Sequence, residues 1–175
     1  MKQNSSSRYA RALFDQSISE NKIDLVFNNM EFIFEELNLK QELYKLTNNP
    51  TIRKDLKVQV FNKAFSPHVD TLTMKFLNLV ISRSRENLLY QTAINFIDMY
   101  YQYKGIITAT VTSAKALTES DRLAIFNKIN PNGKVKVTEL IDPSLLGGLI
   151  INYGGLEYNT SVKKQIINIK KVFEL

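Results

Sequence analysis

The sequence predicts an α+β fold, with an N-terminal six-helix bundle followed by a small mixed α/β C-terminal domain. Up to residue 104 the apolar residues recur with a helical period of about 3.6, and from Gly105 onward they alternate with a period of about 2. A chain of 175 residues is long enough for two small domains. We therefore expect a helical domain over residues 1–104 and a mixed domain over residues 105–175, joined at a change of period rather than by a linker.

Six helical segments are expected in the first part. The clearest covers residues 23–37, where apolar side chains follow the i, i+3, i+4, i+7 pattern throughout. Asn48-Asn49-Pro50 ends the third segment, over residues 39–46, and Ser66-Pro67 follows the fourth, over residues 56–65. The remaining segments lie around Tyr9–Phe14, over residues 39–46 and 56–65, from about 69 to 81, and from about 86 to 103.

The second part predicts the order β-α-β-β-β-α. Its first strand is rich in β-branched residues near 107–112, and Thr118 is the expected cap of the helix that follows. Further strands are expected at 134–141, 149–151 and 156–158. A last helix is expected to begin at Asn159 or Ser161, with one apolar face made of Val162, Ile166, Ile169 and Phe173.

Composition narrows the class of protein. Hydrophobic residues make up 44% and charged residues 23%, which is typical of a globular protein with a packed core. The absence of cysteine excludes disulfides and thiolate metal sites. Because there is no apolar run of 18 residues and no apolar N-terminal segment, we expect no membrane insertion and no export signal, and hence a cytoplasmic protein.

The net charge of +6 is spread along the chain rather than gathered. Residues 1–104 hold 14 basic and 11 acidic side chains, and residues 105–175 hold 9 and 6. A nucleic-acid-binding protein usually concentrates its basic residues in one patch, so an ordinary solvated surface is the favoured interpretation. A basic nucleic-acid-binding module stays open as an alternative because the expected last helix carries Lys163, Lys164, Lys170 and Lys171.

Residues that could carry catalysis are scarce. His68 is the only histidine and has no carboxylate pair beside it in sequence, so a surface or capping role is expected. Asp142 precedes Pro143, where turn formation explains it. Gly147-Gly148 and Gly154-Gly155 flank a strand but lack the lysine and the following helix of a phosphate loop. We therefore predict no catalytic residue, no metal site and no cofactor.

The fifth helical segment is unusually apolar. A helix on the surface of a bundle normally keeps a polar face, so this one is either central or also presents apolar surface to a partner. The sequence alone favours the central position and leaves the other open. The apolar side chains, which cover most of the circumference, are Leu72, Met74, Phe76, Leu77, Leu79, Val80 and Ile81.

Three segments together resemble the delta subunits of F-type ATP synthases, the family of the mitochondrial oligomycin-sensitivity-conferring protein. Tyr9-Ala10-Arg11-Ala12-Leu13-Phe14 is similar to the family's "YAKAL(F)" opening. Asn48-Asn49-Pro50 with Lys57 and Phe65 resembles its "NP…K…LF" stretch. The most specific segment runs from Ile141 to Ile151 and continues at Asn159-Thr160-Ser161-Val162, and it resembles the C-terminal signature "IDPSLIGGxxIxxGdxxiDGSVxxxL".

The resemblance covers essentially the whole chain, with three departures. Asn159-Thr160 replaces the usual Asp-Gly before Ser161, and Gly155 replaces a charged residue after Gly154. Both changes lie in expected turns. The final helix, arginine-rich in the family, is lysine-rich here, and a lysine cannot make the two-pronged contact of an arginine.

The resemblance implies a non-catalytic stator adaptor at the cytoplasmic face of the bacterial plasma membrane. Its N-terminal domain would bind the N-terminal segment of an alpha subunit of the catalytic head, as a helix lying between the first and fifth helices. Its C-terminal domain would contact the peripheral stalk b subunits, so that the head does not turn with the rotor. By position in the matching helices, the partner-binding residues implied are Tyr9, Ala12, Leu13, Phe76, Leu79, Val80 and Arg83.

Overall fold

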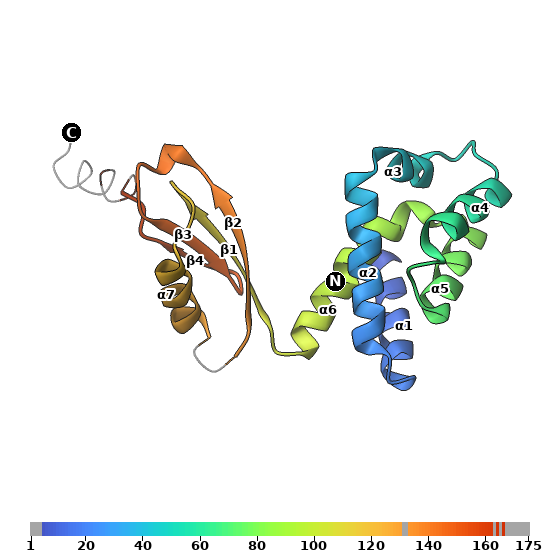
Figure 1. Cartoon of the computed structure of the whole chain (residues 1–175), viewed down its shortest axis with the longest axis horizontal. Helices are drawn as coiled ribbons and strands as arrows, with labels where there is room; N and C mark the ends of the chain where they lie inside the picture. Colours follow the sequence, from blue (N-terminus) through green and yellow to red (C-terminus); the bar gives the residue numbers. More distant parts are fainter. Residues whose placement is uncertain (1–4, 131–132, 163, 165, 167–175) are drawn as a thin grey trace. The chain divides into compact units, whose positions relative to one another are not determined.

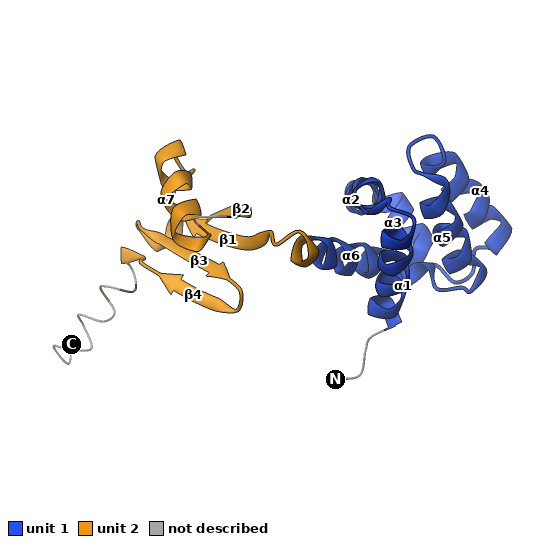
Figure 2. Ribbon diagram, turned by 90° about the horizontal axis from the view of Figure 1, so that it is seen from below, with its two compact units in different colours: residues 1–100 blue, residues 101–175 orange. Residues whose placement is uncertain are grey.

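The computed structural model of the chain describes residues 5–130, 133–162, 164 and 166. Helices and a four-stranded mixed sheet occur among them, so the fold belongs to the predicted α+β class. The chain divides into two compact units, residues 1–100 and residues 101–175 (Figures 1 and 2).

The first unit is built of helices joined by short connections. They are α1 (Ser5–Ser19), α2 (Ile23–Leu39), α3 (Gln41–Asn48), α4 (Lys54–Phe65), α5 (Thr71–Ser82), the short 3₁₀ helix η1 (Glu86–Leu88) and α6 (Leu89–Tyr103), whose last residues belong to the second unit. The predicted segments therefore all appear as helices, although α5 begins at Thr71 rather than near residue 69.

Three helices end in the same way, at a residue with left-handed backbone geometry. Asn21 (φ 55°) follows α1, Ser84 (φ 53°) follows α5 and Gly105 (φ 65°) follows α6. In each case two backbone N–H groups reach back to the last carbonyls of the helix, as after Gly105, where Ile106 donates to Tyr101 at 2.8 Å. This is the Schellman arrangement, and at Gly105 it explains why the hydrophobic period changes there.

One apolar core holds the first unit together. Aromatic rings meet inside it edge to face, for example Phe14 of α1 and Phe96 of α6 at 5.8 Å between centroids. Burial of each large apolar side chain contributes about 1.5–3 kcal/mol. The fully buried members include Val26, Met30, Ile33, Phe61, Phe65, Leu77, Ile81, Leu89, Ala93 and Phe96.

The second unit is a sheet with one helix on it. Its elements are β1 (Ile107–Ser113), α7 (Glu119–Ile129), β2 (Val135–Ile141), the 3₁₀ helix η2 (Pro143–Leu145), β3 (Leu149–Tyr153) and β4 (Leu156–Asn159). The strand order is β2-β1-β3-β4, in which β1 pairs with β2 in parallel and the other neighbours are antiparallel. The parallel pair needs a crossover, and α7 provides it.

Helix α7 packs on one face of this sheet. Its Ile125 and Ile129 join Ala109 and Val111 of β1 and Ile151 of β3 in a second apolar core. The predicted cap Thr118 is confirmed, since its hydroxyl accepts a hydrogen bond from the Asp121 backbone N–H at 3.3 Å. The Asp121 carboxylate in turn accepts from the Thr118 backbone N–H at 3.0 Å, which completes a capping box.

The start of the last helix is only partly described. The hydroxyl of Ser161 accepts a hydrogen bond from the Lys164 backbone N–H at 3.3 Å, in line with the predicted cap. The exposed side chains of Val162 and Ile166 are described. Ile169, Phe173, Lys163, Lys170 and Lys171 lie outside the described residues.

Candidate partner-binding surface on helices α1 and α5

Helices α1 and α5 lie side by side in both views of the first unit (Figures 1 and 2). They meet at Tyr9 and Phe76, whose rings stand edge to face with centroids 6.4 Å apart. We call the region formed by the two helices here the α1/α5 surface. It contains the residues singled out from the sequence, which are Tyr9, Ala12, Leu13, Phe76, Leu79, Val80 and Arg83.

Helix α1 is held in place from the side of α6. The Asn95 side chain of α6 donates to the hydroxyls of Ser6 and Ser7, each at 3.2 Å. Further along, Phe14 packs on Phe96. The turn of α1 between these contacts carries Tyr9, so its ring is held against α5.

Helix α5 begins at a side-chain cap that the sequence reading missed. The carboxylate of Asp70 accepts hydrogen bonds from the Leu72 backbone N–H and the Thr71 hydroxyl, both at 3.2 Å, and lies 3.5 Å from the ammonium of Lys22. Burial by itself raises the pKa of Asp70. The two hydrogen bonds and Lys22 outweigh burial, so the pKa of Asp70 lies below its ordinary value. His68, for which a surface or capping role was expected, is exposed at the surface, and its ring lies 5.1 Å from that of Phe32 between centroids.

Residues 83–85, which we call the exit segment, follow α5 and are hydrogen-bonded to its last turn. The backbone N–H of Arg83 donates to the Leu79 carbonyl at 3.2 Å, and that of Arg85 donates to the Val80 carbonyl at 3.0 Å. Ser84 between them adopts the left-handed conformation that normally favours glycine. The Lys54 ammonium of α4 donates to the carbonyl of Ser82 at 3.3 Å, as expected for a cation at a helix C-terminus.

The predicted site residues divide into an exposed and a buried set. Leu79 is 49% exposed, Ala12 and Arg83 are exposed, and Tyr9 is half-buried. Leu13, Phe76 and Val80 are buried in the core of the unit. Helix α5 therefore buries most of its apolar side chains, and Leu79 is the large one that it leaves open to solvent.

A separate recess of about 830 Å³ lies between α3 and α4. Apolar side chains of Leu39, Leu43, Leu46, Val60 and Ala64 line it together with the polar residues at the start of α3. Sequence reasoning gave no sign of it, because the two helices looked like ordinary amphipathic segments.

A buried ion pair was also missed. Lys57 of α4 and Glu86 of η1 are both buried and bonded to each other through the ammonium and Oε1. Lys57 had appeared only as part of a motif, without a role. The two residues are far apart in sequence, so no local pattern links them.

The candidates for catalysis have structural explanations. The Asp142 carboxylate accepts a hydrogen bond from the Ser144 backbone N–H at 2.9 Å, the turn role that was expected. Gly148 (φ 74°) lies so close to Thr160 that an added Cβ would come within 2.3 Å of its carbonyl oxygen. In the part of the chain that the structure describes, no three histidine, aspartate or glutamate side chains gather as a metal site would require. None of the described helices is long and apolar enough to cross a bilayer.

Comparison with known proteins finds the family that the sequence motifs resemble, and the match extends over nearly the full length of the chain. Residues 6–173 match the family model of the ATP synthase delta (OSCP) subunit. The ATP synthase subunit delta of Brevibacillus brevis is 33% identical over 161 residues, covering 91% of this chain and 92% of the relative. That of Desulforudis audaxviator is 30% identical over 166 residues, covering 94% and 91%.

The fold agrees with that of a solved ATP synthase chain. A chain of the Toxoplasma gondii mitochondrial ATP synthase hexamer superposes with a TM-score of 0.79 over 99% of both chains, at 17% identity. The matching family and relatives define the class of protein as a structural, non-catalytic subunit of an ATP synthase. The chain is a member of the ATP synthase delta (OSCP) subunit family, and thus a structural component of the peripheral stalk rather than a catalytic subunit.

Proposed function

We propose that this chain is the stator adaptor that links the alpha subunit N-terminus on the catalytic head to the b subunits of the peripheral stalk. The six helices α1–α6 would form the bundle that binds the head, and the second unit would contact the stalk. The adaptor would work at the cytoplasmic face of the bacterial plasma membrane, without inserting into it. Its task is to resist torque, so it needs durable binding and no chemistry.

The α1/α5 surface supports the first contact. An amphipathic helix binds a complementary surface by burying apolar side chains, at about 25 cal/mol per Å² before the costs of association. The observation that carries the proposal is the exposure of Leu79, which is 49% open to solvent on a helix whose other large apolar side chains are buried or half-buried. Ala12 is small enough to let a partner helix approach, and Arg83 is exposed at the end of α5.

The second unit supports the stalk contact through its exposed apolar loop. Leu146 adopts a left-handed conformation (φ 63°) and is 72% exposed, two disfavoured features in a leucine. Strained backbone positions cluster at functional sites, so a contact of the stalk with this loop is a reasonable hypothesis. Val162, at the start of the last helix, lies beside the same loop, since its backbone N–H donates to the Gly147 carbonyl at 3.1 Å.

The test is the binding of a peptide with the sequence of the alpha subunit N-terminus. Leu79→Asp places a charge in the contact and should weaken binding by about 1–3 kcal/mol, while the protein stays folded because Leu79 is already half exposed. Leu25→Asp is the matched control: Leu25 is 47% exposed on α2, outside the α1/α5 surface, and its replacement should leave the affinity unchanged.

Calorimetric titration and a thermal melt of each variant separate the possibilities. A large fall in melting temperature for Leu79→Asp with unchanged peptide affinity would mean that Leu79 is a core residue and that the partner binds elsewhere. Equal losses of affinity in both variants would mean that added negative charge, not the surface, is responsible.

A further inference from the structure

We propose that the buried Lys57–Glu86 ion pair positions the last turn of α5, and with it Leu79, Val80 and Arg83 of the α1/α5 surface, for the partner helix. The inference rests on the proposed function and assigns two residues to it that do not touch the partner. Both would be positioning residues, acting through the exit segment that follows α5.

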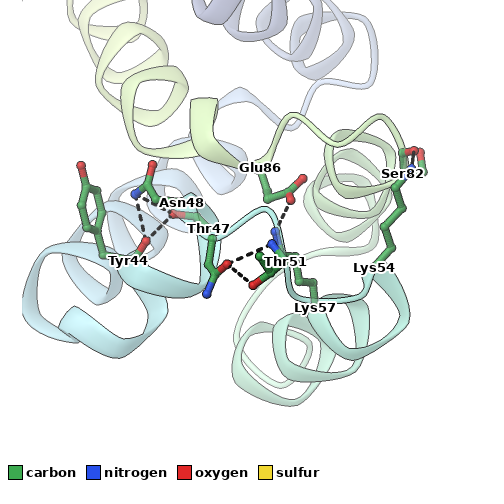
Figure 3. Close-up of polar contacts among 9 residues, drawn as sticks. Tyr44, Thr47, Asn48, Thr51, Lys54, Lys57, Ser82 and Glu86 are labelled. Atoms are coloured by element: carbon green, nitrogen blue, oxygen red, sulfur yellow. Dashed lines mark hydrogen bonds and ion pairs between the residues drawn. The ribbon is translucent and has the colours of Figure 1, made fainter.

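The pair joins α4 to the segment that leaves α5. Lys57 is 2% exposed and Glu86 is 6% exposed, and the Lys57 ammonium donates to Oε1 of Glu86 (Figure 3). Glu86 is the first residue of η1, directly after Arg85. A contact at Glu86 therefore fixes the chain one residue beyond the Schellman arrangement that ends α5.

Backbone hydrogen bonds connect the exit segment to the last turn of α5. The Arg85 backbone N–H donates to the Val80 carbonyl, and the Arg83 backbone N–H donates to the Leu79 carbonyl. These are the carbonyls of two α1/α5 surface residues. Because the left-handed conformation of Ser84 is unfavourable for a residue other than glycine, contacts from outside the segment help to keep this geometry. The Lys57–Glu86 pair supplies a buried contact of this kind.

A second lysine of α4 acts at the same place. Lys54, three residues before Lys57 on the same side of the helix, donates to the Ser82 carbonyl (Figure 3). Helix α4 thus holds the end of α5 at two points, one exposed and one buried. In the connection that leads to α4, the Asn49 side-chain oxygen accepts hydrogen bonds from the backbone N–H and the hydroxyl of Thr51, at 2.9 and 2.6 Å.

The surroundings of the pair favour a role in geometry over one in stability. Oε2 of Glu86 is buried and receives no hydrogen bond from the described residues. The pair borders a recess of about 330 Å³ lined by Thr47, Asn48 and Ser84 among others. A buried ion pair whose charge is incompletely satisfied contributes little to stability, and apolar residues of similar size often replace such a pair without loss. What the ion pair provides is a fixed distance between α4 and η1.

The experiment compares the full chain with the double variant Lys57→Met, Glu86→Met. This variant removes both charges and keeps the volume, so it avoids leaving one charge buried alone. Two quantities are measured: the affinity for the alpha subunit N-terminal peptide, and the hydrogen-exchange rates of the Ser84 and Arg85 amides. Leu37→Ala on α2, which opens a cavity in the core without removing a charge or a hydrogen bond, is the control for lost stability alone.

We expect the double variant to fold with a melting temperature close to that of the wild type. Its Ser84 and Arg85 amides should exchange at least about tenfold faster, and its peptide affinity should fall about tenfold, which is about 1.4 kcal/mol. Leu37→Ala should lower the melting temperature and leave the affinity unchanged.

Unchanged exchange and affinity in the double variant would overturn the inference, as would an equal loss of affinity in Leu37→Ala. If the single variant Lys57→Met fails to fold, the double variant still decides the question. A wild-type protein that does not bind the peptide would refute the proposed function instead, and the exchange rates would then show whether the pair fixes the end of α5.

Discussion

The cap of α5 allows a prediction in which charge and hydrogen bonding can be separated. Asp70→Ala removes the side chain that accepts from the Leu72 N–H and the Thr71 hydroxyl and that pairs with Lys22. Loss of an N-cap costs about 1 kcal/mol, and the ion pair, whose lysine is 37% exposed, adds a fraction of that. For a unit of this size about 1 kcal/mol corresponds to a fall of about 4–8 °C in melting temperature.

Asp70→Asn isolates the charge. Asparagine caps helices about as well as aspartate, so this variant should lose only the ion-pair contribution at neutral pH. The pKa of Asp70 is lower in the folded protein than in the unfolded chain. The stability due to its charge is therefore complete above the unfolded pKa of about 4 and is lost as the pH falls through the lower, folded pKa. The difference in stability between the wild type and Asp70→Asn should therefore shrink as the pH falls through that range.

Thermal melts followed by circular dichroism at 222 nm, from neutral pH to about pH 2, measure these effects. Asp15→Asn is the control, because its pair with Arg11 is exposed on both sides and its loss should change little. If the melting temperatures of Asp70→Asn and Asp70→Ala fall by the same amount at neutral pH, the side chain does not act as a cap. If the gap between wild type and Asp70→Asn persists at the lowest pH, the carboxylate does not act through its charge.

Two further predictions concern the domain boundary and the second unit. A fragment of residues 1–104 should fold alone into a nearly all-helical domain with one cooperative melt, and substantial β-structure in its circular dichroism would contradict the predicted boundary. Gly148→Ala should destabilise the second unit by at least about 2 kcal/mol, because its Cβ would lie 2.3 Å from the Thr160 carbonyl oxygen at a φ of 74°. Gly155→Ala has a similar φ but open space around it, so urea unfolding should show a smaller loss of about 1 kcal/mol. Equal losses in the two variants would mean that the close approach at Gly148 does not matter.

Local patterns predicted the elements of this fold well. The alternation of β-branched residues placed β1, and Thr118 was recognised as the cap of α7 from residue type and position. The change of period at Gly105 coincides with a helix end for which glycine is the preferred residue. The left-handed ends at Asn21 and Ser84 carry residues that are common in other conformations, so residue type did not predict them.

Contacts between distant segments were not predictable in the same way. Glu139 lies among the apolar positions of β2 and pairs with Arg122 of α7 at 2.8 Å, which an alternating pattern read along one strand cannot show. Leu123 of α7 is exposed and Ile125 is buried, although both are apolar, because the face of a weakly amphipathic helix is chosen by the sheet it packs on. Exposure of Leu79 likewise depends on α1 and on the helices beneath it, so the sequence could mark α5 as unusual without saying which side is open.

The pairing of β1 has a consequence for the order in which the chain folds. This central strand has β2 on one side and β3 on the other, and its register with β3 places Ala109 opposite Tyr153. Both partner strands are distant from β1 in sequence. Bringing distant segments together costs conformational entropy before their contacts form, and this slows folding. The first unit precedes this sheet in the chain, so its helices leave the ribosome first. During synthesis the first unit should therefore be able to fold while β1 of the second unit still lacks both of its partner strands.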